Sequence, residues 1–281
     1  MKRLPDIPVL QIVPTDALHP HERHDDQRAQ PLVADLRASG MLKNPPIVMP
    51  LGGERIRYVV LDGANRVVAM RLLGLPHALV QVAHPNGDSV DVKTWNHIVM
   101  CQEPEALFER LNRTRDLSLQ TADANQISLA LDQGEALAGL AAFPDKLYKI
   151  VGQANMSLAE RLDTLNHLAN CYYEKCRFER TGASTLRELE GYYPDMACLV
   201  IFPNFEVRDV VTAAAEGLYF PSGITRFLVS PRALRVNYPL DRLSADKSIE
   251  EKQAELQAWI SERMQKRQVR FYAESTFLFD E

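Results

Sequence analysis

Short apolar runs and helical repeats of apolar residues alternate over the first hundred positions of the chain. Runs rich in β-branched residues predict strands, and apolar residues three and four positions apart predict helices. Helices are therefore expected at residues 25–40 and 66–74, each closed by a glycine. The expected strands lie at residues 9–18, 46–50, 56–62 and 77–85. This alternation is typical of a compact α/β module that ends near residue 100.

The rest of the chain continues as a mixture of helices and strands, without a clear linker or an internal repeat. The expected helices are 104–115, 127–131, 157–170, 206–217 and 247–268. The expected strands are a hairpin at 139–152 and segments at 198–205, 224–230, 233–240 and 270–281. The pattern indicates two parts, residues 1–100 and residues 101–281.

Composition narrows the class of protein. A hydrophobic content of 46% over 281 residues supports a packed core. The net charge of -5 disfavours a dedicated DNA-binding protein, because such proteins are usually basic. No apolar run approaches the roughly 18 residues of a membrane-spanning helix, and the N-terminus lacks the continuous apolar core of a signal peptide. We therefore expect a cytoplasmic protein without a membrane partner.

The four cysteines, Cys101, Cys171, Cys176 and Cys198, form no CxxC pair. Their spacing indicates neither a disulfide scaffold nor a zinc site. We expect buried or idle thiols.

The most informative stretch is YVVLDGANRVVAMRLLGL, residues 58–75, in which a strand ends in Asp-Gly and a helix begins almost at once. Such a junction directs free backbone N–H groups and the positive end of the helix dipole at one point, which makes an anion site. Gly63 lets the backbone approach a ligand, and Arg66 can bind a phosphate with two parallel hydrogen bonds. Asp62 ends the strand, where a carboxylate can hold Mg²⁺ or accept a proton. An ordinary turn, with Asp62 as a cap and Arg66 in solvent, fits the same pattern.

Two other nucleotide-binding motifs are missing from the sequence. The chain has no GxxxxGK[ST], which excludes a P-loop NTPase, and no GxGxxG, so that a dinucleotide-binding fold has no support.

The segment DGANR followed by VVAMRLLGL resembles the DGxHR-plus-helix signature of the ParB/sulfiredoxin superfamily, which binds nucleotide phosphates at this turn. Further blocks resemble the free L-serine kinase branch of that superfamily, in the same order along the chain: HPHERHD, VKTWNHIV, PSGITRFLVSPRAL and RFYAESTFLFDE. The last two are most similar to a siderophore-biosynthesis member of the branch. Residues 103–195 match poorly. The family's usual histidine in DGxHR is Asn65 here, which can still donate to a phosphate oxygen.

The resemblance implies a fold and a function. Residues 1–100 would form a ParB/sulfiredoxin-like nucleotide-binding domain with a mixed sheet, and residues 101–281 an α/β domain that packs against it and completes the substrate site. The protein would be a kinase that uses ATP (or ADP) and Mg²⁺ to phosphorylate free L-serine or a similar hydroxy amino acid. The product, O-phospho-L-serine, would feed siderophore or 2,3-diaminopropionate biosynthesis. The oligomeric state is not indicated.

The resemblance also implies roles for particular residues. Glu22 would orient and deprotonate the serine hydroxyl, and Asp62 would support catalysis and hold the metal. The residues expected to contact the nucleotide are Gly63, Ala64, Asn65, Arg66 and Lys43. The residues expected to contact the acceptor are Trp95, Ser222, Thr225 and Arg226. Thr225 and Arg226 together would hold the acceptor's carboxylate, with the Arg226 guanidinium beside the Thr225 hydroxyl.

Several of these residues also have a plain structural interpretation. Glu22 fits a solvated loop glutamate, Trp95 a core residue and Arg226 an exposed strand end. Three histidines crowd the loop around Glu22, but HERH lacks the HExxH spacing of a zinc protease. His97 is expected to be a strand or loop histidine without a special role.

Two rival functions come from the same superfamily. A ParB-like regulator that binds nucleotide and DNA would need a helix-turn-helix and a basic recognition helix after the first domain. The helix expected at 157–170 carries Glu160, Asp163 and only one arginine, so it suits DNA phosphates poorly. A sulfiredoxin-type reductase would need a cysteine in the phosphate turn, where this chain has Gly-Ala-Asn.

Overall fold

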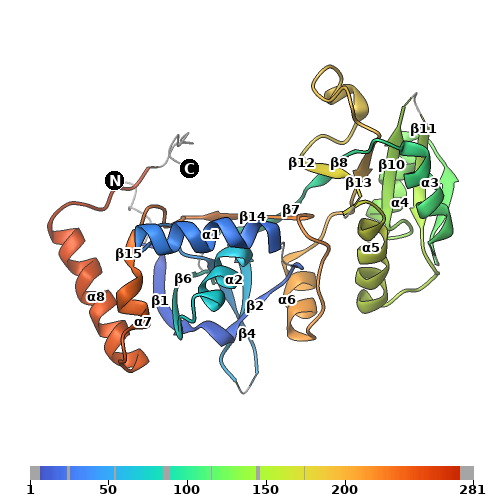
Figure 1. The fold of residues 1–281 in the computed structure, drawn as a ribbon. Helices are drawn as coiled ribbons and strands as arrows, with labels where there is room; N and C mark the ends of the chain where they lie inside the picture. Colours follow the sequence, from blue (N-terminus) through green and yellow to red (C-terminus); the bar gives the residue numbers. More distant parts are fainter. Residues whose placement is uncertain are drawn as a thin grey trace, which may run out of the picture.

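The computed structural model describes residues 7–23, 26–53, 55–84, 89–114, 116–143, 146–173 and 175–272. Figure 1 shows two lobes, each built on its own sheet, with a two-stranded ribbon running between them. The first lobe combines the N-terminal strands with the C-terminal helices, and the second holds the middle of the chain. The mixed α/β class expected from the sequence is confirmed.

The first lobe contains a mixed five-stranded sheet in the order β1-β6-β4-β5-β2. Its strands are β1 (Val9–Pro14), β2 (Leu18–Pro20), β4 (Ile47–Leu51), β5 (Arg57–Asp62) and β6 (His77–Val82). β4 runs parallel to β6 and β2 runs parallel to β5, whereas the other pairs are antiparallel. Both faces of the central strands are buried, since Val59 and Val60 belong to hydrophobic clusters on opposite sides of the sheet. Burial on both faces explains the continuous apolar run of β5.

Helices from both ends of the chain cover this sheet. The elements are η1 (Thr15–Ala17), α1 (Asp26–Ser39), α2 (Ala64–Leu72), α7 (Leu240–Ser244) and α8 (Ile249–Gln265), with a short pair of strands, β3 (Met41–Leu42) and β15 (Tyr238–Pro239). Leu256 of α8 is fully buried in the cluster that also contains Val60. The Ile12 N–H donates to Gln253 Oε1 at 2.8 Å, which ties α8 to the edge strand β1.

The second lobe contains an antiparallel six-stranded sheet in the order β12-β8-β13-β10-β11-β9. Its strands are β8 (Asn96–Met100), β9 (Ser118–Thr121), β10 (Ala138–Ala142), β11 (Lys146–Val151), β12 (Arg177–Thr181) and β13 (Cys198–Ile201). Its helices are α3 (Pro104–Arg113), α4 (Ala124–Asp132), α5 (Leu158–Tyr173) and the short η2 (Leu186–Glu188). A capping box begins α5, because Glu160 accepts from the Ser157 N–H at 2.8 Å and its own N–H donates to Ser157 Oγ at 3.3 Å.

Two connecting elements join the lobes. The ribbon consists of β7 (Ser89–Thr94) and β14 (Thr225–Ser230), and helix α6 (Val207–Ala215) lies below it in Figure 1. One hydrophobic cluster contains Val59 of the first sheet, Val210 of α6 and Val99 of the second sheet. The two lobes therefore share a continuous core. A domain boundary at residue 100 stays a prediction. In the structure, β8, which ends at residue 100, belongs to the second sheet, and the C-terminal helices α7 and α8 pack on the first sheet.

Most of the predicted elements are confirmed within a few residues. The strand predicted at 233–240 is wrong, because only Tyr238–Pro239 is extended into a strand. Arg235 and Asn237 have φ angles of 51° and 52°, and this left-handed backbone cannot form a ladder. Residues 144–145 of the predicted hairpin turn and residues 273–281 of the predicted last strand lie outside the described residues. Among the helices that the structure describes, none is both long and apolar enough to cross a bilayer.

The interpretation of the cysteines as unlinked thiols is wrong for two of the four. Cys101 and Cys176 form a disulfide, whereas Cys171 and Cys198 are free and buried as expected. Met100 of β8 and Arg177 of β12 are antiparallel partners. Cys101 directly follows Met100 and Cys176 directly precedes Arg177, so strand pairing brings the two sulfurs together. The two cysteines are 75 positions apart in the sequence, and no sequence motif indicates that they pair. Burial raises the pKa of the Cys198 thiol to about 12, which keeps it protonated and unreactive.

Replacing both Cys101 and Cys176 with serine is expected to lower the free energy of unfolding by about 2–4 kcal/mol, because the disulfide closes a long loop in the unfolded chain. Denaturant unfolding without reductant measures the change. Dithiothreitol should lower the free energy of unfolding of the parent to that of the variant and leave that of the variant unchanged. A parent that is indifferent to dithiothreitol would contradict the expectation.

Candidate functional site

The strand-to-helix junction after β5 has the geometry of an anion site. Gly63 is the N-cap of α2 with φ 90° and ψ 28°, a left-handed conformation that glycine adopts without strain. No side chain caps this helix, so that the N–H groups of its first turn, from Ala64 to Arg66, are directed at the space in front of it. A Cβ at Gly63 would lie 2.8 Å from Arg66 Nε, which means that Arg66 folds back over the glycine.

Two arginines surround the carboxylate at this corner. Arg66 Nη2 donates to Asp62 Oδ2 at 3.4 Å, and Arg66 Nη1 donates to the Asn44 carbonyl at 3.0 Å. Arg232 forms an ion pair with the same Asp62 Oδ2. Within the described part of the chain, Asp62 Oδ1 has no hydrogen-bond partner. Among the described residues the corner therefore holds two arginines and one carboxylate, and Asp62 Oδ1 is still available there.

Arg232 is a site residue that the sequence interpretation missed. Buried Gln81 of β6 holds the loop that carries it: Gln81 Nε2 donates to the Pro231 carbonyl, and the Ala233 N–H donates to Gln81 Oε1, both at 2.8 Å. A buried side-chain amide must have such partners. The available signal was a glutamine in the middle of the apolar run ALVQVA.

Glu22 lies in a clamp made by the loop before β14. Its Oε2 accepts from the Gly223 N–H at 2.7 Å, and its Oε1 accepts from the Thr225 N–H at 2.9 Å. The Thr225 hydroxyl donates to the same Oε1. The Tyr173 hydroxyl donates to the Ser222 carbonyl at 2.7 Å and fixes the loop from the second lobe. Glu22 is therefore an oriented carboxylate with its lone pairs partly engaged, unlike a solvated loop glutamate.

His21 extends this network into the first sheet. The ring is buried, with Nδ1 2.5 Å from the Val60 carbonyl and Nε2 2.6 Å from Thr225 Oγ1. A carbonyl only accepts, so Nδ1 carries a proton. The Thr225 hydroxyl oxygen lies between the two groups, since it donates to Glu22 Oε1 and is in hydrogen-bond contact with His21 Nε2. His21, Thr225 and Glu22 are therefore joined in one continuous chain of hydrogen bonds.

The structure brings Glu22 and Asp62 to the same edge of the first sheet. β2 and β5 are parallel, with Pro20 paired to Val60, and each carboxylate follows two residues later. The bond from His21 to the Val60 carbonyl holds the two chain segments together beyond the ladder. The clamp and the anion corner are therefore neighbouring parts of one site.

The other residues predicted for the site make contacts of their own. Along β14 the side chains alternate, with Thr225 buried and Arg226 exposed, so these two residues face opposite sides of the ribbon. The Arg226 guanidinium lies 4.5 Å from the ring centroid of half-buried Trp95, in a cation–π contact. Lys43 is exposed after β3, and its carbonyl accepts from the Asn237 N–H at 3.2 Å.

His97 is another residue whose place the sequence did not reveal. It lies in β8 as expected, but it is fully buried, with Nε2 3.2 Å from the Gly223 carbonyl and Nδ1 2.7 Å from the Tyr172 hydroxyl. Burial lowers the pKa of His97 to about 4, partly offset by the bond to Gly223 and assisted by the charge of Arg180. His97 is thus neutral near pH 7, donates from Nε2 and helps to hold the loop that clamps Glu22.

We expect the protein to lose stability as the pH falls from 6.5 towards 4. The folded-state pKa of His97 is below its ordinary value, so the unfolded chain binds the extra proton first. The free energy of unfolding should decrease by about 2 kcal/mol between pH 7 and pH 5 on this account. Urea unfolding at both pH values measures it. The control is His97→Gln, which should lack this component, and equal pH dependence in both proteins would contradict the expectation.

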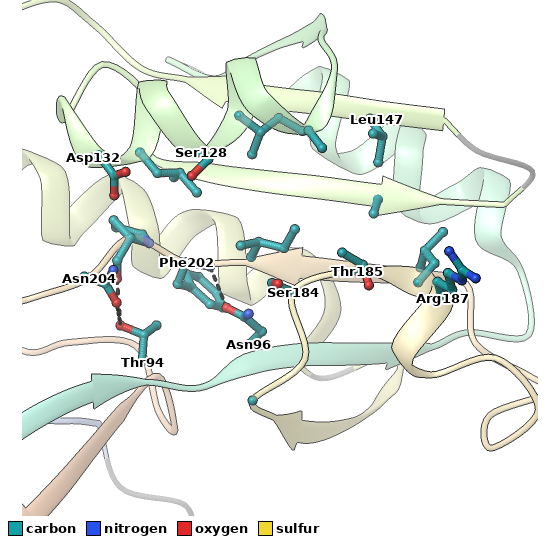
Figure 2. Close-up of a pocket in the computed structure, with 18 residues that line it drawn as sticks. Thr94, Asn96, Ser128, Asp132, Leu147, Ser184, Thr185, Arg187, Phe202 and Asn204 are labelled. Atoms are coloured by element: carbon teal, nitrogen blue, oxygen red, sulfur yellow. Dashed lines mark hydrogen bonds between the residues drawn. The ribbon is translucent and has the colours of Figure 1, made fainter.

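A separate cavity of about 540 Å³ lies in the second lobe, between α4 and the loop that leads into η2. Figure 2 shows Asp132 and Ser128 on one side, Thr185 and Arg187 on the other, and Asn204 at one end. No residue predicted for the nucleotide or the acceptor lines it. It is therefore distinct from the site formed by Glu22 and Asp62.

The described residues contain no group of three or more histidine, cysteine, aspartate or glutamate side chains that could hold a metal ion. His21 is engaged by Val60 and Thr225, and His24 of the same loop lies outside the described residues. A metal at this site would have to take most of its ligands from water and phosphate, as Mg²⁺ does in nucleotide sites.

Two known proteins are similar to most of this chain. It is 32% identical over 246 residues to an ATP-dependent L-serine kinase of Staphylothermus marinus, covering 84% of this chain and 94% of the relative. It is 24% identical over 248 residues to the ATP-dependent L-serine kinase SbnI of Staphylococcus aureus, covering 86% and 87%.

A solved structure, free serine kinase in complex with AMP, has a similar fold, with a TM-score of 0.70 and 18% identity over 85% of this chain and 95% of that one. No protein-family model matches the sequence. The level of identity to the Staphylothermus protein, sustained over nearly its full length, shows that the chain belongs to the family of ATP-dependent L-serine kinases.

Proposed function

We propose that this protein phosphorylates the hydroxyl group of free L-serine with ATP, giving O-phospho-L-serine and ADP. Membership of the L-serine kinase family supports this function. The observation that carries it is the oriented Glu22 carboxylate, which lies on the same sheet edge as the uncapped N-terminus of α2. Phosphoryl transfer to an alcohol requires a carboxylate that can accept the hydroxyl proton and, beside it, a site that binds the phosphate anions.

The terminal phosphates of the nucleotide would bind at the corner after Asp62. The N–H groups of the first turn of α2 and the helix dipole favour negative charge there. Asn65 and Arg66 would add side-chain donors, and Arg232 would add a second cation. A ParB/sulfiredoxin-like first domain is consistent with this use of the turn. ATP is the donor that we favour over ADP, because the relatives are named ATP-dependent.

Mg²⁺ fits the donor set at this corner. Asp62 has one oxygen engaged by arginines and one without a partner among the described residues. Asp62 Oδ1 would hold the ion, with phosphate oxygens and water as the other ligands. When bound, Mg²⁺ would neutralise charge on the phosphates.

Glu22 would act as the general base. The serine hydroxyl oxygen attacks the γ-phosphorus, the bond from that phosphorus to the β–γ bridging oxygen breaks, and ADP leaves. The hydroxyl proton passes to Glu22, whose Oε2 accepts only the Gly223 N–H among the described residues and so keeps a lone pair for the proton. The loop of Ser222 and Thr225 orients the base, and contacts of this loop with the acceptor stay a prediction, as do those of Trp95, Arg226 and Lys43.

A nucleotide- and DNA-binding regulator is the alternative that we set aside. The first turn of α5 carries Glu160, and its exposed face adds Asp163, which would repel DNA phosphates. A cytoplasmic location and a link to siderophore or 2,3-diaminopropionate biosynthesis stay predictions.

The test is direct. Purified protein is incubated with Mg²⁺, ATP or ADP, and a panel of free L-serine, L-threonine and L-homoserine, and the products are identified by mass. We expect phosphoserine with ATP. No phosphorylated amino acid with any combination would overturn the proposed function.

A further inference from the structure

Arg180 of β12 lies directly against the loop that holds Glu22. Arg180 is paired with His97 in the antiparallel ladder, so the two side chains leave the sheet on the same face, towards Gly223. A Cβ at Gly223 would lie 2.7 Å from Arg180 Nη2 and 2.8 Å from its Cζ. The guanidinium therefore covers one side of the glycine whose N–H binds Glu22. Only a glycine leaves room for it.

Arg180 is an exposed residue, and its guanidinium has no hydrogen-bond or ion-pair partner among the residues that the structure describes. Three other arginines around the site have partners, whereas the side chain of Arg23, next to Glu22, has none among the described residues. Arg66 and Arg232 contact Asp62, and Arg226 stacks on Trp95 across the ribbon. Burial and the charge of Glu22 raise the pKa of the Tyr173 hydroxyl, and the charges of Arg180 and Arg23 lower it, so Arg180 lies close enough to the clamp to act on it.

We propose that Arg180 binds the carboxylate of the amino-acid acceptor. The inference rests on the proposed function and adds the group that recognises the substrate as a free amino acid. In serine, the carbon that bears the hydroxyl and the carboxyl carbon are attached to the same Cα, so two neighbouring protein groups can contact both ends at once. Glu22 and Arg180 are such neighbours, because they meet on Gly223.

Charge also favours this assignment. A carboxylate that approaches the ionised Glu22 is repelled unless a cation neutralises it. Glu22 is held by two N–H groups and a hydroxyl rather than by Arg180, which leaves the guanidinium fork for a second carboxylate. Arg226, expected from the sequence to bind the carboxylate, faces away from Glu22 on the other side of β14. A seryl residue inside a peptide has no carboxylate at this position and would be a poor acceptor.

The experiment compares L-serine with L-serinamide, which has a neutral amide in place of the carboxylate. The variants are Arg180→Gln, Arg180→Lys and, as a matched control, Arg177→Gln, which removes an exposed arginine from the same strand. We expect the parent and Arg177→Gln to prefer L-serine by about 100-fold in kcat/KM. In Arg180→Gln this preference should fall to a few-fold, through a rise of about 30- to 100-fold in the KM for L-serine, with the KM for ATP unchanged. Arg180→Lys should be intermediate, because lysine keeps the charge but not the fork.

Three results would overturn the proposal. Arg180→Gln retains the parent's preference for L-serine; or it loses kcat equally with both acceptors, which would place Arg180 on the transferred phosphoryl group; or Arg23→Gln, and not Arg180→Gln, abolishes the preference. A thermal unfolding midpoint equal to the parent's excludes misfolding of Arg180→Gln. A parent that phosphorylates neither acceptor shows instead that the proposed function is wrong, and that outcome is visible before any variant is made.

Discussion

Replacing Glu22 with glutamine is expected to lower kcat for L-serine phosphorylation by about 10³-fold, the size of effect expected for loss of a positioned general base. The glutamine keeps an oxygen for the two donors of Thr225 but cannot take a proton from the acceptor. Its amide group would also meet the Gly223 N–H donor to donor, so the loop loses one hydrogen bond. Steady-state formation of phosphoserine measures kcat.

Nucleotide binding distinguishes a chemical defect of this variant from a collapsed site. In the proposed complex the phosphates bind at the α2 corner and Glu22 does not contact them, so the Kd for ATP should equal that of the parent. Glu216→Gln, at an exposed position after α6, is the matched control and should have the parent's kcat. If Glu22→Gln turns over at the parent rate, Glu22 is not the base.

Replacing Arg66 with alanine is expected to weaken ATP binding by about 10- to 100-fold, because hydrogen bonds to charged groups contribute about 1.5–3 kcal/mol. The side chain lies over Gly63 and between Asp62 and the Asn44 carbonyl, at the mouth of the predicted phosphate site. Its loss also leaves Arg232 as the remaining described partner of Asp62 Oδ2. Isothermal titration with ATP, and separately with AMP, measures the effect.

The AMP titration identifies which part of the nucleotide Arg66 contacts. If Arg66 binds the terminal phosphates, the loss for AMP should be much smaller than that for ATP. Arg113→Ala is the control, since it removes an equal charge at a position whose side chain is 81% exposed and pairs only with Glu109 in the described structure. An equal loss for both nucleotides would contradict a contact with the terminal phosphates, and an unchanged Kd for ATP would contradict any phosphate contact.

The positions of the predicted acceptor residues could not be derived from the local sequence. Thr225 and Arg226 are adjacent in the sequence and were assigned to one receptor, but adjacent residues of a strand point to opposite faces. Thr225 consequently binds Glu22, whereas Arg226 stacks on Trp95. The predicted strand at 233–240 failed for a related reason. Its apolar alternation is local, but the backbone is directed by Asn44, whose side-chain oxygen accepts from the Arg235 N–H at 2.8 Å.

The sequence by itself determined the elements and the anion corner. Periodicity of apolar residues is a property of neighbouring positions, so β5, α2 and α5 could be predicted to within three residues at their ends. The corner from Asp62 to Arg66 is contiguous, and its geometry follows from a strand, a glycine and a helix in succession. The resemblance of separated blocks to the kinase branch added the function.

Only the tertiary structure decided which distant segments of the chain come into contact. Glu22 and Thr225 meet across 203 positions of sequence, Arg232 and Asp62 across 170, and Cys101 and Cys176 across 75. Arg180 comes from the part of the chain where the resemblance was poor. Such contacts depend on which strands pair, in which register, and on which face each side chain leaves the sheet. These choices are made by packing of the whole chain, and a local pattern of apolar and polar positions does not specify them.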